Sequence, residues 1–148
     1  MKTGDACRRN VVVVKRHTPI PMAAKMMRQN HIGSLVVVDD LDERVPVGIV
    51  TDRDLVVEIV AADLDPRTMK VGEIMVGQLV TAAEDDDSLD TLKAMRLRGV
   101  RRMPVVTDKG ILVGIATLDD LLGILAQEMG DLARVIETER SREGVARR

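Results

Sequence analysis

The chain has 148 residues, of which 45% are hydrophobic and 31% charged, and its formal net charge is −2. It has no Phe, Tyr or Trp, so it lacks the aromatic platforms on which single-stranded nucleic acids usually stack, and its acidic balance argues against nucleic-acid binding in general. The one cysteine, Cys7, cannot form an intramolecular disulfide, and no apolar run approaches membrane-spanning length or a secretory signal. We therefore expect a soluble cytoplasmic protein.

The first half of the chain predicts the order β-α-β-β-α. Three β-rich runs are expected to form strands, at Val11–Val14, Ser34–Val38 and Val45–Val50. Thr18 is the expected N-cap of the first helix, with Pro19 at its first helical position. A second helix is expected from Asp52 to about Ala61.

The second half predicts the same order of elements. The expected strands are Leu79–Ala82, Arg102–Val106 and Ile111–Ala116. One helix opens in the acidic run 85–88, where negative charge suits the positive end of the helix dipole. A last helix runs from Leu118 to about Met129. Both halves thus predict an α/β unit that is too small to bury a full core alone.

The two halves also repeat each other in sequence. An offset of 68 pairs Val12 with Val80, Lys25 with Lys93, Met27 with Met95 and Val37 with Val105. After a loop that is longer in the first half, an offset of 66 pairs Gly48 with Gly114, Thr51 with Thr117 and Asp54 with Asp120. We therefore predict four segments: a repeat at 3–62, a linker at 63–70, a repeat at 71–130 and a charged tail at 131–148, helical at first and then disordered.

The most specific local pattern is Gly-x-x-Thr-x-x-Asp at each predicted strand-to-helix junction, at Gly48–Asp54 and Gly114–Asp120. A purely structural role would explain the Thr-x-x-Asp spacing, because Thr at the N-cap and an acid three residues later form a capping box. A functional interpretation adds a carboxylate beside free backbone N–H groups, where sugar hydroxyls and a phosphate can both be bound. The pattern alone leaves both interpretations open.

With these features the chain resembles a pair of CBS (cystathionine β-synthase) domains, a Bateman module. The resemblance rests on the repeat order, on the opening Val71–Met75, on Arg101–Val106 and on the doubled Gly-x-x-Thr-x-x-Asp pattern, and it covers about residues 3–129. It implies two β-α-β-β-α repeats packed as a pseudo-twofold pair. It also implies that AMP, ADP, ATP or S-adenosylmethionine binds in clefts between the repeats.

The resemblance further implies roles for individual residues. Asp54 and Asp120 would hold ribose hydroxyls, and Thr51 and Thr117 would lie near phosphates. Adenine would sit among aliphatic side chains and backbone, with Val11–Val13 beside Ile49 in one cleft and Val80–Ala82 beside Ile115 in the other. The implied ligand-binding set is Val12, Val13, Ser34, Ile49, Thr51, Asp54, Thr81, Ala82, Arg101, Arg102, Ile115, Thr117 and Asp120.

The two clefts are not expected to be equivalent. Arg101 and Arg102 can bind phosphate oxygens with their planar guanidinium groups, or can be ordinary solvated surface residues. The first repeat has Gly33 and Ser34 at these positions. We expect Asp54 to share a cleft with the arginines, and Asp120 with Ser34 to form a weaker or empty one.

No catalytic or metal-binding pattern emerges from the remaining residues. His17 and His31 lie in different elements without a cysteine or a second histidine nearby, and His31 suits a helix C-cap. We therefore expect no enzyme activity and no cofactor, but a sensor that forms a homodimer and regulates a partner protein. The alternative is an interaction module whose clefts stay empty and whose task is dimerisation. A nucleotide hydrolase would need a general base that the sequence does not offer.

Overall fold

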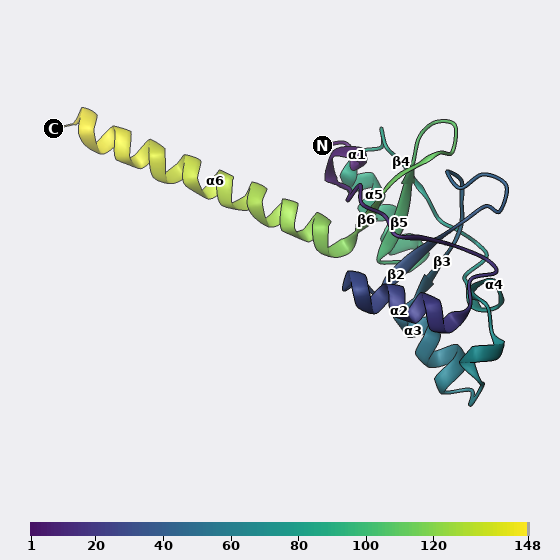
Figure 1. Ribbon diagram of the computed structural model, residues 1–148. Coiled ribbons are helices and arrows are strands. Elements are labelled where there is room, and N and C mark those ends of the chain that lie inside the picture. The colour runs from purple at the N-terminus through teal and green to yellow at the C-terminus, as the bar shows by residue number, and fades with distance from the viewer. Residues whose placement is uncertain (148) are drawn as a thin grey trace.

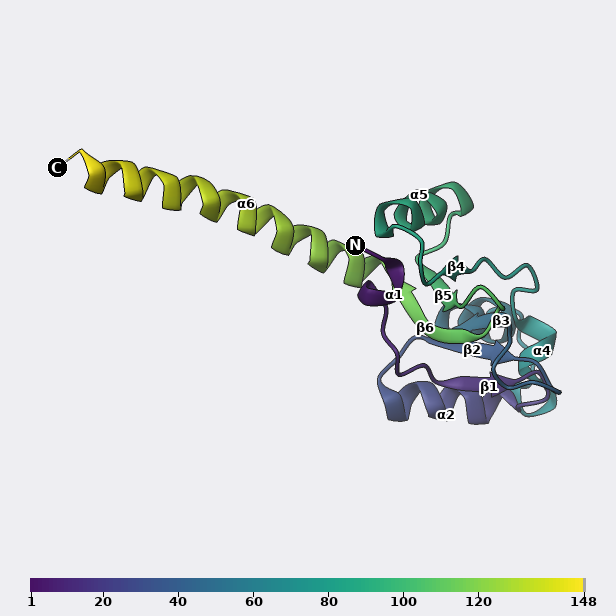
Figure 2. The same ribbon diagram turned by 90° about the horizontal axis from the view of Figure 1, so that it is seen from above.

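Two three-stranded sheets, one from each half of the chain, form the centre of the molecule (Figures 1 and 2). The computed structural model describes residues 1–147. The first sheet contains β1 (Val13–Lys15), β2 (Ser34–Val38) and β3 (Pro46–Thr51), and the second contains β4 (Ala82–Ala83), β5 (Arg102–Val106) and β6 (Leu112–Thr117).

The two sheets have the same pairing pattern. β1 pairs parallel with β2, and β2 pairs antiparallel with β3; β4, β5 and β6 repeat this arrangement. Even the irregularity recurs, because the register shifts between Val37 and Val38 and again between Val105 and Val106. The predicted α/β fold with two β-α-β-β-α repeats is confirmed.

The helices flank and link these sheets. The first half contains α2 (Ile20–Asn30), the short α3 (Asp52–Leu55), its continuation as a π-helical turn (Val56–Val60) and a 3₁₀ turn at Pro66–Thr68. The second half contains α5 (Ser88–Arg98) and α6 (Leu118–Ala146). Two one-turn helices, α1 (Thr3–Ala6) and α4 (Val71–Ile74), precede the sheets of the two halves.

These one-turn helices are exchanged between the repeats. The segment with α1 hydrogen-bonds to the second repeat: Gly4 N donates to Glu84 O at 2.9 Å, and the Thr3 hydroxyl is 2.7 Å from that of Thr91 in the interior. The segment with α4 hydrogen-bonds to the first repeat, where Gly72 N donates to Arg16 O at 2.8 Å. Each repeat therefore contributes its opening segment to the other.

The buried cores follow this exchange. The first core takes its buried side chains from residues 14–71, with Leu35 and Ile59 among the largest, and α4 packs against it through Ile74. The second core combines Ala6 with residues 82–121. Because aromatic side chains are absent, branched aliphatic and methionine side chains fill both cores.

The start of α2 corrects one prediction. Thr18 is not the N-cap: its hydroxyl accepts from Lys15 N at 3.2 Å, and the helix begins at Ile20 with Pro19 in the cap position. The backbone here is drawn into the exchanged contact, because Thr18 O accepts from Val71 N and Ile20 N donates to Met69 O. His31 does end α2 in the left-handed conformation (φ 53°), as predicted.

The long helix α6 is the largest difference from the sequence prediction. The sequence predicted a helix to about Met129 and then a tail that is helical at first and disordered after that. Instead, one continuous helix runs to Ala146 and projects from the two-sheet body in both views (Figures 1 and 2). Arg148, the last residue of the predicted tail, lies outside the described residues. Within residues 1–147, no helix is long and apolar enough to cross a membrane.

Candidate ligand-binding clefts

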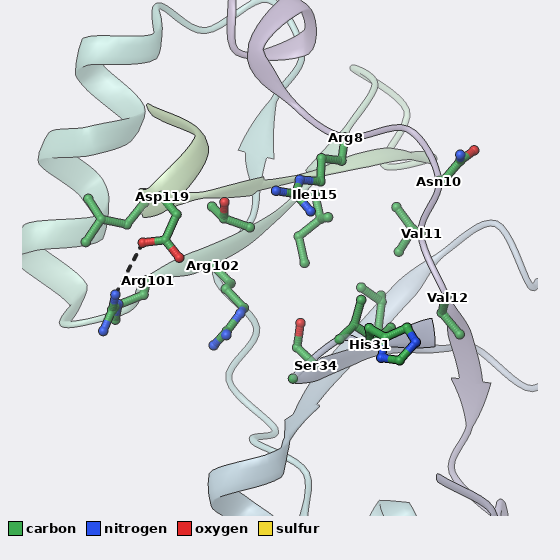
Figure 3. A pocket seen from close by; sticks show the side chains of 15 residues that line it. Arg8, Asn10, Val11, Val12, His31, Ser34, Arg101, Arg102, Ile115 and Asp119 are labelled. Atoms are coloured by element: carbon green, nitrogen blue, oxygen red, sulfur yellow. Dashed lines mark hydrogen bonds and ion pairs between the residues drawn. The ribbon is translucent and has the colours of Figure 1, made fainter. Parts of the chain in front are cut away.

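Two cavities lie between the repeats, and equivalent positions of the two repeats line them. The Asp54 cleft has a volume of about 240 Å³ and is lined by Ile49, Thr51, Asp52, Arg53, Asp54, Val76, Gln78, Leu79, Val80, Val100, Arg101 and Arg102. The Arg8 cleft has a volume of about 280 Å³, and its lining includes Arg8, Asn10, Val11, Val12, His31, Ser34, Ile115, Thr117 and Asp119, together with Arg101 and Arg102 (Figure 3).

In the Asp54 cleft a carboxylate stands at the start of a helix. Thr51 caps α3: its hydroxyl accepts from Asp54 N at 3.2 Å, while the Asp54 carboxylate accepts from Thr51 N at 2.8 Å. This is the complete capping box that the spacing predicted. The cap uses Oδ2 of Asp54, and within the described residues Oδ1 has no hydrogen-bond partner. Asp54 can therefore cap the helix and still accept a hydrogen bond from a molecule in the cleft.

The same cleft combines an apolar wall with positive charge. Ile49 and Val80 lie on its lining and are partly buried, while Arg101 and Arg102 come from the start of β5. Guanidinium groups bind phosphate oxygens with paired, directional hydrogen bonds. The cleft thus presents aliphatic, hydroxyl-accepting and phosphate-binding groups together.

Next to the Arg8 cleft, the carboxylate that corresponds to that of Asp54 is already paired. It belongs to Asp120, which does not itself line the cleft, and it accepts from Arg8 Nε at 2.9 and 3.1 Å and from Arg8 Nη2 at 2.8 Å. Thr117 adds a further contact, because its hydroxyl donates to Asp120 Oδ2 at 2.7 Å. The hydrogen bonds from Arg8 lower the pKa of Asp120, with smaller help from Thr117.

Arg8 is held in place by its backbone. Arg8 N donates to Ile115 O at 3.0 Å, and Ile115 N donates to Arg8 O at 2.9 Å, so the exchanged N-terminal segment pairs with β6. Val76 occupies the same position beside Ile49 in the other cleft. One substitution between the repeats, arginine for valine, decides whether the cleft carboxylate has an internal partner.

The arginines Arg101 and Arg102 line both clefts. Arg101 Nη2 donates to Asp119 of the Arg8 cleft at 3.4 Å, and both side chains are exposed (Figure 3). The structure brings Asp54 together with Arg101 and Arg102, as the sequence suggested. Ser34 was expected to share its cleft with Asp120, but it lines the Arg8 cleft with Thr117, and Asp120 lies outside that lining. Arginines shared by the two clefts were not foreseen.

The apolar pairing in the clefts corrects another prediction. Val11–Val13 were expected beside Ile49, and Val80–Ala82 beside Ile115. The structure exchanges these partners: Val11 and Val12 line a cleft with Ile115, and Val80 lines a cleft with Ile49. The opening segments cross between the repeats, so the residues just before each first strand line a cleft with the motif strand of the other repeat.

Four predicted residues do not line either cleft. Val13 is in β1 with its side chain exposed, Thr81 is exposed, and Ala82 is buried in the second core. The fourth is Asp120, whose carboxylate is paired with Arg8. The crossing also explains the motif glycines. A Cβ on Gly114 would stand 2.7 Å from Arg8 O, and one on Gly48 would stand 2.8 Å from Met75 Sδ. The glycines therefore permit close approach of the exchanged segments.

Sequence reasoning missed Arg8, Asn10, Gln78, Arg53 and Asp119 as lining residues. The 68-residue offset contained a usable signal, because it aligns Arg8 with Val76 and shows a charge difference between the repeats. His31 was interpreted only as a helix cap, but it also lines the Arg8 cleft. No cluster of His, Cys, Asp and Glu within residues 1–147 could hold a metal ion.

Comparisons with known proteins agree with this architecture. Residues 4–61 and 71–127 each match the CBS domain family. An uncharacterized protein of Methanopyrus kandleri is 37% identical over 125 residues, which are 84% of this chain and 62% of that protein. The curated relative therefore extends well beyond the matched region.

Two solved structures are similar in fold and contain adenosine ligands. A CBS domain protein of Pyrobaculum aerophilum complexed with AMP has a TM-score of 0.76 and 25% identity, covering 86% of this chain and 99% of that one. The CBS domain pair of protein MJ0100, in complex with 5′-methylthioadenosine and S-adenosyl-L-methionine, also has a TM-score of 0.76 and 25% identity, covering 86% and 98%.

Proposed function

Because the chain belongs to the CBS domain family as a tandem pair of CBS domains, we propose that it binds an adenosine-containing ligand and regulates a partner protein. The ligand class is AMP, ADP, ATP or S-adenosylmethionine. The observation that carries the proposal is the Asp54 cleft, which combines Asp54 Oδ1, the apolar Ile49 and Val80, and two arginines. The solved relatives with AMP and with S-adenosyl-L-methionine support the same ligand class.

Each lining residue of the Asp54 cleft binds the part of the ligand that suits its chemistry. Asp54 accepts hydrogen bonds from the ribose hydroxyls, as an anionic acceptor suits a pair of donors. Ile49 and Val80 contact the adenine, and Arg101 or Arg102 binds phosphate oxygens. The residues bind and orient a ligand, and the proposal includes no enzymatic step and no cofactor. The regulated partner protein, in the cytoplasm, would respond to the ligand-bound form.

We also propose that the protein forms a homodimer or a larger assembly. Each repeat leaves large apolar side chains exposed on its helices, including Met22, Val56 and Val60 in the first. Such surfaces are usually covered in an oligomer. The alternative function is a ligand-free dimerisation module, and the pairing of Arg8 with Asp120 favours it for one cleft.

The absence of aromatic residues provides a sensitive test. Without Trp or Tyr the protein scarcely absorbs at 280 nm, so a co-purified adenine compound dominates its ultraviolet spectrum. We expect a peak near 260 nm, identified by mass spectrometry after denaturation, or saturable heat on titration with AMP, ADP, ATP or S-adenosylmethionine. Protein that carries no adenine compound and binds none of the four would leave the dimerisation module as the function.

A further inference from the structure

The exposed face of α6 carries a regular apolar stripe beyond the first turns of the helix. Leu118 and Leu121 pack against the second core, and Leu121 is buried. Further along, five large apolar side chains are 39% to 68% exposed, and we call them the α6 seam: Leu122, Leu125, Met129, Leu132 and Ile136. α6 projects away from the two-sheet body along most of its length (Figures 1 and 2).

The seam has the spacing of a coiled coil. The intervals along it are three, four, three and four residues, so in a heptad Leu122, Met129 and Ile136 occupy a positions and Leu125 and Leu132 occupy d positions. A narrow a/d stripe fits one neighbouring helix rather than a broad core surface. Leucine at both d positions with isoleucine at an a position suits a two-stranded pair.

The charges next to the seam argue for a protein partner over a membrane surface. A helix that lies on anionic lipid carries Lys and Arg on its polar face. The polar faces of α6 are mainly acidic, with Glu128, Asp131 and Glu137 among them, and the helix has no aromatic residue to anchor it. The far end combines both signs of charge.

The charges at the C-terminal end of α6 are complementary to those of a second copy in a parallel, in-register pair of helices. Continuing the heptad places Glu139 at d, Arg140 at e, Arg142 at g and Glu143 at a. In a parallel pair in register, an e residue lies beside the d residue of the partner helix, and a g residue lies beside its a residue. Arg140 then neutralises Glu139 of the other copy, and Arg142 neutralises Glu143.

From the seam and these charges we propose that α6 forms a parallel two-stranded coiled coil with α6 of a second copy of this chain. The contact begins at Leu122, near the last residues of α6 that pack on the second core, and ends at the ion pairs around Glu143. This proposal rests on the homodimer of the proposed function and names α6 as the contact that forms it. Because the contact needs no ligand, it is tested in ligand-free protein. The projecting helix then gains the packing that isolated helices need in water.

Sedimentation equilibrium of three proteins tests the proposal. The seam variant is Leu132→Glu/Ile136→Glu, two exposed positions that do not contact either core. The matched control is Thr138→Glu/Val145→Glu, which adds the same charge on the polar side of α6, away from the seam. We expect the mass of the wild-type assembly to halve in the seam variant, with a dissociation constant raised at least a hundredfold, and to stay unchanged in the control. Circular dichroism verifies that the variants are folded.

A cysteine probe tests the orientation. In a Cys7→Ser background, Leu132→Cys forms an intermolecular disulfide on mild oxidation if the helices are parallel and in register, because a d residue then faces its own copy. A monomeric wild type, or a seam variant with the mass of the wild type, would overturn the α6 contact. A seam-dependent assembly in which Leu132→Cys forms no cross-link would overturn the parallel arrangement.

Discussion

The Asp54 cleft and the Arg8 cleft occupy equivalent places in a duplicated backbone, yet their charges are arranged in opposite ways. Beside the Arg8 cleft, Arg8 pairs with Asp120, and Ser34 occupies the position that corresponds to Arg102, although Arg101 and Arg102 line this cleft too. In the Asp54 cleft, Val76 leaves the carboxylate without a cation, and the arginines lie at the strand start instead. The backbone sets where a cleft forms, and one substitution, Arg8 at the position equivalent to Val76, decides whether the aspartate is already paired.

The largest expected effect comes from removing Arg101 and Arg102, which line the Asp54 cleft and also the Arg8 cleft. A charge-assisted contact to phosphate contributes roughly 1.5–3 kcal/mol, or about ten- to a hundredfold in affinity for each arginine. Arg101→Ala/Arg102→Ala should therefore weaken AMP by about a hundredfold or more and adenosine far less, as measured by titration calorimetry. Arg96→Ala/Arg98→Ala, exposed on α5, is the control. Equal losses for AMP and adenosine would show that the pair acts through structure alone.

The next effect separates the two roles of Asp54. Asp54→Ala removes the capping box and should lower the free energy of unfolding by about 1 kcal/mol. If the carboxylate also holds the ribose, the variant loses most of the stabilisation by AMP, which depends on affinity as RT ln(1 + [L]/Kd). Thermal unfolding across an AMP titration measures both quantities.

Two further variants help to separate the capping role of Asp54 from its ribose role. Asp54→Asn keeps a side-chain acceptor at the helix start but should bind the ribose less well, because its amide is uncharged. Asp120→Ala is the matched change next to the other cleft and should lower the stabilisation by AMP only slightly, since the Asp120 carboxylate is already paired with Arg8. A full AMP increment in Asp54→Ala would defeat the ribose assignment.

A smaller effect is expected from removing Arg8, which should make ligand binding in the two clefts more similar. Arg8→Ala releases Asp120 from its ion pair, and pairs with one exposed partner contribute about 0.5–1 kcal/mol. We expect affinity in the Arg8 cleft to rise by about two- to fivefold, seen as a second binding event in calorimetry. Val76→Ala, at the equivalent position, should leave the Arg8 cleft unchanged. Unaltered stoichiometry and affinity in Arg8→Ala would mean that the ion pair does not limit binding.

The smallest effect is a pH dependence. Arg8 lowers the pKa of Asp120 in the folded protein, so the pair adds stability above the ordinary aspartate pKa, and this contribution is lost as the pH falls through the lowered value. Between pH 7 and about pH 3, wild type should lose about 0.5 kcal/mol more stability than Arg8→Gln, because the variant has no pair to lose. Urea unfolding at both pH values measures the difference. Identical losses would show that the ion pair does not stabilise the fold.

The sequence alone predicted the fold well, and physical reasons explain where it fell short. Repeated strand and helix patterns predicted β2 and β5 with correct ends, because buried apolar runs are long and unambiguous there. The one-turn helices α1 and α4 were not predicted as elements, since four residues show no periodicity. Their exchange is a long-range pairing that local patterns do not contain, and it governs which residues share a cleft.

The candidate site was predicted where its contacts are local in sequence and was missed where they depend on the exchange. Asp54 and Thr51 were found because a capping box has a fixed local spacing. Arg8 was missed because its partner, Asp120, lies 112 residues away, and only the exchange brings them together. The length of α6 was underestimated because its charged half resembles a disordered tail in composition, while the seam continues in it at regular spacing.

The exchanged segments also determine where the chain can be divided. All side chains of the first core lie between Val12 and Met75, so a fragment of residues 10–76 is a contiguous unit with its own closing helix, α4. The second core has no such fragment, because it needs Ala6 and Cys7 together with residues 80–124. Cutting the chain at the repeat boundary therefore separates two halves that each carry a piece of the other. Such halves, made as separate polypeptides, can fold properly only by finding one another again.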